Sequence, residues 1–291
     1  MNKPRLLVIG ARGFVGNYVV RSAAERFEVI RGDRGAGQEP GRVSVDVSDP
    51  VSVDRAFDQV RPDAVALLAA IADIDVCEAS PKRAYATNTR GAENVAQACA
   101  RSAARLLFTS TGAVFDGKKH GYTEEDAVSP VSVYGKTKVE AERIVASVQP
   151  NSVILRFSLV VGFASHQGTN AVLDKLVRSW KSGETLSFST KESRNPIDVG
   201  SLAKIISELL ANEKVSGVYH TGSSDSVTRY GLAKRLAARA GFPTELVRPQ
   251  DAAVPGRAPR GEDHFLLADK LRKVCDFEIG TTDHVIERCF S

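Results

Sequence analysis

The chain has 291 residues, of which 43% are apolar and 25% are charged, and this balance predicts a globular protein rather than an intrinsically disordered one. The net charge of +4 is mild and no dense block of Lys and Arg occurs, so the charge pattern does not support a nucleic-acid or membrane-surface partner. Dispersed cysteines, a longest apolar run of residues 64–72 and a start without a secretory signal pattern predict a cytoplasmic protein with no membrane span and no metal site.

The first half of the chain alternates short apolar runs with helical patterns. Strands are predicted at residues 5–9, 27–31, 43–45, 64–68, 106–110 and 152–157, and helices at 14–25, 51–59, 81–104 and 132–148. Because strands and helices alternate with short connections, we expect an α/β fold with a Rossmann-type, doubly wound parallel sheet that is covered by helices on both faces.

The pattern changes after Gly162. Helices predicted at residues 171–182, 199–211 and 228–240 are separated by longer polar stretches rich in Gly, Ser and Pro. We interpret this part as a smaller C-terminal substrate-binding lobe over the carboxyl ends of the strands, where open α/β sheets bind ligands. The expected division is an NAD(P)-binding Rossmann domain at residues 1–165 and a substrate lobe at 166–291, partly interleaved with the sheet.

A glycine-rich loop, GARGFVG at residues 10–16, follows the first predicted strand and opens the first helix. Gly10 permits a tight turn, Gly13 lets backbone N–H groups approach a diphosphate, and Gly16 allows the helix to pack closely on the sheet. The alternative is a plain strand-to-helix turn, but the flanking strand and helix favour dinucleotide binding. The residues of this loop predicted to bind the cofactor are Gly10, Arg12, Gly13, Phe14, Val15 and Gly16.

Acidic residues after the next two strands are expected at the adenosine end of this site. Asp33 lies about 20 residues beyond the glycines, where a carboxylate accepts hydrogen bonds from the ribose hydroxyls of NAD. Arg12 and Arg34 are close to it, and an arginine here can hold the 2′-phosphate of NADP, so the expected cofactor is NADP or NAD. Asp46 and Val47 can contact the adenine edge or, alternatively, form the turn that begins a helix.

Tyr134 and Lys138 open a later helix and share one face, because they are four residues apart. An adjacent ammonium is expected to lower the pKa of the Tyr134 phenol, which is ordinarily about 10, toward working pH. The phenol can then exchange a proton with the substrate while a nicotinamide exchanges hydride, and both residues are expected to contact the cofactor. Thr111 ends the preceding strand and is expected to hydrogen-bond the substrate oxygen, while Ser110 faces the cofactor or the sheet. Asn88 is interpreted as a polar interior residue bonded to backbone.

Four segments together resemble the extended short-chain dehydrogenase/reductase family, and they follow the family's order: GARGFVG, the Tyr85-Ala86-Thr87-Asn88 segment, TSTGAVFDG and YGKTK. Within the NAD-dependent epimerase/dehydratase superfamily the chain is most similar to the dTDP-4-dehydrorhamnose reductases. This resemblance implies that Thr111, Tyr134 and Lys138 take the catalytic positions. It also implies reduction of a 4-keto group on a nucleotide-linked deoxysugar by NADPH or NADH. The family's alanine pair near the adenosine is kept as Ala69 and Ala70.

The chain departs from this family at the sugar pocket. Gly112 and Ala113 stand where the reductases have Asp-Tyr, and Leu159 and Val160 stand where an aromatic residue is common. The resemblance therefore leaves the substrate open between a nucleotide-sugar and another small carbonyl compound.

Substrate-side candidates lie in the second half of the chain. Arg194, together with Arg257 and Arg260, can grip a diphosphate bidentately, although each can equally be a surface charge in a loop. Asn170 and His166 lie where the lobe begins, as substrate contacts or as solvated loop residues. A homodimer through helices that flank the sheet is expected from the resemblance.

Three functions remain open from the sequence. A reductase and a C4 epimerase of the same family both use the Tyr134 and Lys138 pair, whereas a dehydratase is disfavoured because Gly112-Ala113 lacks the acidic pair that follows the catalytic Ser/Thr. The third is a non-catalytic, nucleotide-sensing regulatory subunit, as in methionine adenosyltransferase. The altered sugar pocket suits a regulatory subunit, but Thr111, Tyr134 and Lys138 favour an enzyme, since a binding module has no need of a perturbed phenol.

Overall fold

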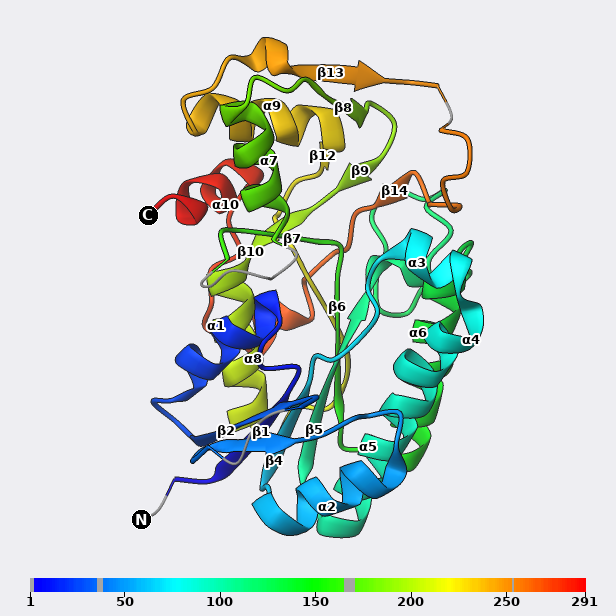
Figure 1. The fold of residues 1–291 in the computed structure, drawn as a ribbon, viewed down its shortest axis with the longest axis vertical. Helices are drawn as coiled ribbons and strands as arrows, with labels where there is room; N and C mark the ends of the chain where they lie inside the picture. Colours follow the sequence, from blue (N-terminus) through cyan, green and yellow to red (C-terminus); the bar gives the residue numbers. More distant parts are fainter. Residues whose placement is uncertain (1–2, 36–38, 165–170, 253) are drawn as a thin grey trace.

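The computed structural model describes residues 3–35, 39–164, 171–252 and 254–291. Its centre is a seven-stranded parallel sheet of order β11-β6-β5-β4-β1-β2-β3 (Figure 1). The strands are β1 Arg5–Ile9, β2 Glu28–Asp33, β3 Arg42–Ser44, β4 Ala64–Leu67, β5 Arg105–Thr111, β6 Val153–Phe157 and β11 Gly217–Thr221. The strand order reverses between β1 and β4, and open α/β sheets bind ligands at such a switch point.

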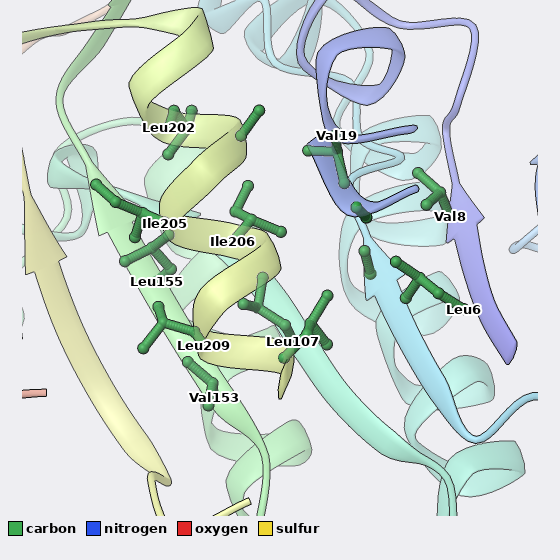
Figure 2. Close-up of a cluster of buried hydrophobic side chains, with 14 of the residues drawn as sticks. Leu6, Val8, Val19, Leu107, Val153, Leu155, Leu202, Ile205, Ile206 and Leu209 are labelled. Carbon is green, nitrogen blue, oxygen red and sulfur yellow. The ribbon is translucent and has the colours of Figure 1, made fainter. Parts of the chain in front are cut away.

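Helices cover both faces of this sheet: α1 Phe14–Ala23, α2 Pro50–Val60, α5 Gly91–Ser102, α6 Val133–Val148 and α8 Val199–Ala211. Successive side chains of a strand point to opposite faces, so the strands feed two cores. Leu6 and Val8 of β1 belong to the core with α1 and α8. Leu7 and Ile9 belong to the core with α2 and α5. Figure 2 shows the first core, where side chains of β1, β5 and β6 share one apolar cluster with α1 and α8: Leu6, Val8, Val19, Leu107, Val153, Leu155, Leu202, Ile205, Ile206 and Leu209.

The second half of the chain builds a smaller lobe, drawn at the top of Figure 1. Its helices are α7 Val172–Lys181, α9 Arg229–Arg239 and α10 Thr282–Cys289. Its strands are β7 Leu159–Val161, β8 Leu186–Ser189, β9 Ser193–Arg194, β10 Pro196–Asp198, β12 Val227–Thr228, β13 Val247–Gln250 and β14 Asp263–His264. A separate apolar cluster, which includes Leu173, Trp180, Leu232 and Leu236, holds α7 against α9.

The predicted α/β class and parallel sheet are confirmed, and several elements differ from the predicted ones. The helix expected over residues 81–104 is broken into α4 Pro81–Tyr85, a π-helical turn at Ala86–Arg90 and α5. The short helix α3 Ile74–Ala79 and the strand β11 were not predicted. After residue 165 the chain contributes α8 to one face of the sheet and β11 to its edge beside β6.

Among the helices of the described ranges, none combines the length and apolar character needed to cross a bilayer. Within those same ranges, no three His, Cys, Asp or Glu side chains gather in a way that could hold a metal ion. All four cysteines are free thiols.

Candidate active site

The glycine-rich loop connects β1 to α1 and lies against the end of β4. Gly10 has a φ of +92°, and a Cβ on it would lie 2.8 Å from the Ala69 backbone nitrogen. A Cβ on Gly16 would lie 2.1 Å from the Gly10 carbonyl oxygen, so α1 can approach the loop this closely only with a glycine there. Gly13 begins α1, and no side chain caps that helix end. The first turn of α1 therefore offers backbone N–H groups and the positive dipole end to an anion.

A cavity of about 270 Å³ opens at the carboxyl ends of β1, β2 and β4. The predicted cofactor residues that line it are Gly10, Gly13, Asp33, Arg34, Asp46, Val47, Ala69 and Ala70. The other predicted cofactor residues do not line it, namely Arg12, Phe14, Val15, Gly16, Tyr134 and Lys138, and Gly16 instead packs α1 on the loop. The cavity brings the glycine loop and the adenosine-side residues together at the switch point of the sheet.

Asp33 is held by the loop that it faces. Its Oδ1 accepts a hydrogen bond from the Arg12 backbone nitrogen at 2.8 Å. Burial raises the pKa of Asp33, and the Arg12 N–H partly opposes this by lowering it. Asp46 makes a turn before α2, because its Oδ1 accepts from the Ser48 nitrogen at 2.9 Å and from the Ser48 hydroxyl at 2.6 Å. Asp46 thus serves as a turn residue and also lines the cavity.

Six residues that line the cavity were not predicted as cofactor residues: Ile9, Val45, Leu68, Ile71, Arg83 and Thr87. Arg83 lies on α4 and Thr87 lies in the π-helical turn, so both reach the cavity from the break in the predicted long helix. Because they are four residues apart, the sequence indicates that Arg83 and Thr87 share one helical face. It does not indicate that this face borders the cavity, which depends on how the helix packs.

Thr111 and Tyr134 are brought together by the packing of α6 on the end of β5. The Thr111 hydroxyl accepts from the Ala113 backbone nitrogen at 3.1 Å and caps a short 3₁₀ turn. A Cβ on Gly135 would lie 2.2 Å from the Ala113 carbonyl oxygen, so the start of α6 touches that turn directly. The Ser132 hydroxyl caps α6 by accepting from the Gly135 nitrogen at 3.1 Å. The glycine after Tyr134 thus permits the close approach.

Lys138 is buried beneath this pair. Its Nζ donates to the Thr109 carbonyl oxygen at 2.7 Å and lies 3.9 Å from the centre of the Phe108 ring. Burial lowers the pKa of Lys138 to about 7, and the carboxylate of Glu142 partly opposes that shift.

The expectation that Lys138 lowers the pKa of Tyr134 is wrong for the protein alone. Burial raises the pKa of Tyr134 to about 12, and the Thr111 hydroxyl, which can donate to the phenolate, is the influence that lowers it. The Lys138 ammonium is directed at the Thr109 carbonyl, and its own charge is weakened by burial. Tyr134 is therefore a protonated phenol at neutral pH.

Asn88 ties the end of β4 to α6, from within the π-helical turn. Its Oδ1 accepts from the Ile71 nitrogen at 2.8 Å, and its Nδ2 donates to the Ile71 carbonyl at 3.0 Å and to the Thr137 hydroxyl at 3.1 Å. The predicted backbone bonding of this residue is confirmed. Thr137 in turn donates to the Tyr134 carbonyl at 2.7 Å, so the network reaches the helix that carries Tyr134 and Lys138. Single π-helical turns are frequent at functional sites.

The structure gives Arg194 an internal set of contacts. Its guanidinium is buried and donates to the carbonyl oxygens of Ser193 at 2.7 Å, Glu262 at 3.0 Å and Gly261 at 3.1 Å. It also pairs with the Glu192 carboxylate at 3.4 Å. Contact of Arg194 with a substrate stays a prediction.

The other predicted substrate-side arginines have different ion-pair partners. Arg257 pairs with Glu192, whereas Arg260 pairs with Asp75 on α3 at 2.6 Å. His166 and Asn170 lie outside the described residues. Arg229, at the start of α9, was not predicted. Burial lowers its pKa, Glu192 partly opposes that shift, and Arg257 and Arg260 lower the pKa further.

Comparisons with known proteins agree with this geometry. The family model described as RmlD substrate binding domain matches residues 4–291. The probable low-salt glycan biosynthesis reductase Agl14 of Haloferax volcanii is 30% identical over 262 residues, which cover 87% of each chain. Methionine adenosyltransferase 2 subunit beta of Xenopus tropicalis is 26% identical over 274 residues, or 93% of this chain and 82% of the relative. The crystal structure of dTDP-4-dehydrorhamnose reductase from Bacillus anthracis in complex with NADP has a TM-score of 0.90, with 25% identity and 99% of both chains covered.

Proposed function

The chain belongs to the RmlD substrate binding domain family, and from this premise we propose that it is an NAD(P)H-dependent reductase of a nucleotide-linked 4-keto-deoxysugar. The observation that carries the proposal is the convergence of Thr111 and Tyr134 above the buried Lys138, in a fold whose switch point holds a cavity for a dinucleotide. The similarity to two proteins named as reductases supports the same reaction class.

The cavity suits the adenosine and diphosphate part of a nicotinamide dinucleotide, NADP or NAD. The uncapped first turn of α1 beside Gly10 and Gly13 suits its diphosphate. Asp33 and Arg34 lie where they would meet the adenosine ribose, and Ala69 and Ala70 line the same cavity. When bound, the reduced cofactor supplies the hydride.

Tyr134 acts as the acid in this reaction. With a pKa of about 12, the phenol is protonated at neutral pH and donates its proton to the oxygen of the carbonyl that is reduced. The Thr111 hydroxyl, next to that phenol, holds the same oxygen. Lys138 lies one helical turn further along α6, and its amine, when protonated, would favour the phenolate that remains.

The lobe formed mainly by residues 166–291 would bind the substrate. Arg229 and Arg257 lie beside the single carboxylate of Glu192, so this part of the lobe carries excess positive charge for a nucleotide diphosphate. An apolar pocket lined by Leu159, Val160 and Arg229 lies next to them. We also retain a cytoplasmic location and a homodimer as predictions.

A nucleotide-sensing regulatory subunit is the second candidate. The similarity to methionine adenosyltransferase 2 subunit beta over most of both chains favours it, as do Gly112 and Ala113 in place of the reductases' Asp-Tyr. A C4 epimerase would use the same Tyr134 and Lys138. The complete set of Thr111, Tyr134 and Lys138 ranks the reductase first.

Replacement of Tyr134 by Phe tests the proposed reaction. We expect Tyr134→Phe to lower kcat by about 10²–10⁴-fold, because the acid is lost, and to leave the affinity for NADPH nearly unchanged. The measurement is oxidation of NADPH with a nucleotide 4-keto-deoxysugar, together with a fluorescence titration of NADPH. Tyr230→Phe on α9 is the matched control. A Tyr134→Phe protein that turns over at nearly the wild-type rate would remove this residue from the mechanism.

A further inference from the structure

Glu142 is a buried carboxylate one helical turn beyond Lys138 on α6. Its Oε2 accepts from Arg156 Nη2 at 2.6 Å, and its Oε1 accepts from Arg156 Nε at 2.9 Å. The Ser110 hydroxyl of β5 also donates to Oε1. Glu142 therefore joins the catalytic helix to two strands of the sheet, β5 and β6.

These bonds continue the contact that Lys138 makes. Lys138 bonds the carbonyl of Thr109, Glu142 bonds the hydroxyl of Ser110, and Thr111 is the next residue of β5. Two successive turns of α6 are thus attached to two successive residues of β5, just before the strand presents Thr111. This arrangement fixes the register between the helix that carries Tyr134 and Lys138 and the strand that carries Thr111.

We propose that Glu142 is a positioning residue that holds Lys138 and Thr111 in one register through its bonds to Ser110 and Arg156. The inference rests on the proposed function for its effect on turnover. Two apolar residues could fill the space of the ion pair, and such replacements often preserve stability. They could not accept the Ser110 hydroxyl or place a negative charge beside Lys138.

The charge of Glu142 also acts on Lys138. The groups that face Lys138 are Glu142 on α6, Cys77 on α3, and the Thr109 carbonyl and Phe108 ring on β5. Of these, the Glu142 carboxylate raises the pKa of Lys138 most, against the lowering by burial.

Arg156 and His220 complete the surroundings of Glu142. Arg156 of β6 faces the carboxylate, and His220 of β11 lies 3.4 Å from Arg156 Nη1. Burial and the Arg156 charge lower the pKa of His220 to about 3, so this imidazole is neutral. Loss of the Glu142 charge would leave the Arg156 cation unbalanced, and we expect the pKa of Lys138 to fall below about 7.

The test compares three variants and needs no substrate for its first measurement. Glu142→Gln removes the charge, the double variant Glu142→Leu/Arg156→Met replaces the whole ion pair by apolar residues, and Glu140→Gln removes an exposed charge from the same helix as the control. Lys138 is followed by NMR of lysine labelled at Cε, with its signal assigned from Lys138→Met. We expect the Lys138 titration midpoint to fall by about 1 unit or more in Glu142→Gln, to fall by less in the double variant because the Arg156 cation is also removed, and to stay unchanged in the control.

The second measurement is turnover. We expect kcat to fall about tenfold or more in Glu142→Gln and in the double variant with the KM for NADPH unchanged, and Glu142→Asp to recover part of the loss. Should Glu142→Gln fail to fold, the double variant decides. A folded double variant with the wild-type Lys138 midpoint and kcat overturns the proposal. If the midpoint shifts as expected while the wild-type protein reduces no sugar, the positioning of Lys138 stands and the reductase function fails.

Discussion

Asp33 and Arg34 face the same cavity and favour different dinucleotides. A carboxylate accepts hydrogen bonds from the 2′-hydroxyl of NAD and repels the 2′-phosphate of NADP, whereas an arginine does the reverse. Asp33 already accepts from the Arg12 nitrogen through Oδ1, which fixes the carboxylate at the end of β2. Its other oxygen is the one that can meet a ribose.

Asp33→Ala should therefore weaken NADH more than NADPH. The loss of one hydrogen bond to a charged group costs about 1.5–3 kcal/mol, so we expect NADH affinity to fall about tenfold or more and NADPH affinity to change little. Fluorescence titrations with both dinucleotides measure this, with exposed Asp58→Ala as the control. An equal fall in both affinities would show that Asp33 does not discriminate between them.

For the residues of the candidate site, the sequence predicted which side chains lie close together but not their pKa values. The spacing of Tyr134 and Lys138 and the position of Thr111 at a strand end follow from local pattern. The pKa values depend on burial, which comes from the packing of α6 on β5 and is invisible in the spacing. Arg229 was missed for a similar reason, since its surroundings come from residues distant in sequence.

Among the elements, β1 and β4 were predictable because each contains a continuous apolar run that is buried on both faces. The break at Ala86–Arg90 was not predictable, because the segment Ala-Thr-Asn-Thr-Arg contains no Gly or Pro that would mark an interruption of the helix. The register of α1 on β1 depends on one residue, Gly16, whose missing side chain lets the helix touch the glycine loop.

Gly16→Ala should destabilise the protein, although alanine is the better helix former. The new Cβ would lie 2.1 Å from the Gly10 carbonyl oxygen, so backbone must move, at a cost of about 1–3 kcal/mol or more. Gly200→Ala in α8 is the control, because its Cβ would meet only the Asp198 carboxylate, at 3.3 Å. Urea unfolding of both variants and NADPH titration measure the effect. Equal stability of the two variants would contradict the packing role of Gly16.

In the whole molecule, contacts between distant segments join the lobe to the sheet. Arg260 and the Ala258 nitrogen, at 2.8 Å, both bond Asp75 of α3, so the chain before β14 is tied to the end of the sheet beside the cavity. His264 of β14 lies against Gly112, where a Cβ would meet the His264 Cβ at 3.1 Å. Neither contact could be predicted from one sequence, because about 150 or more residues separate the partners and only the folded topology joins them.

The most direct test of the reductase proposal is a titration of the purified protein with NADPH and NADH, followed by a screen of nucleotide 4-keto-deoxysugars for oxidation of the bound cofactor. We predict saturable binding of at least one reduced dinucleotide and its oxidation by at least one of these sugars. Binding without turnover on any sugar would contradict the reductase proposal and favour the regulatory subunit. Failure to bind either dinucleotide would contradict the assignment of the cavity itself.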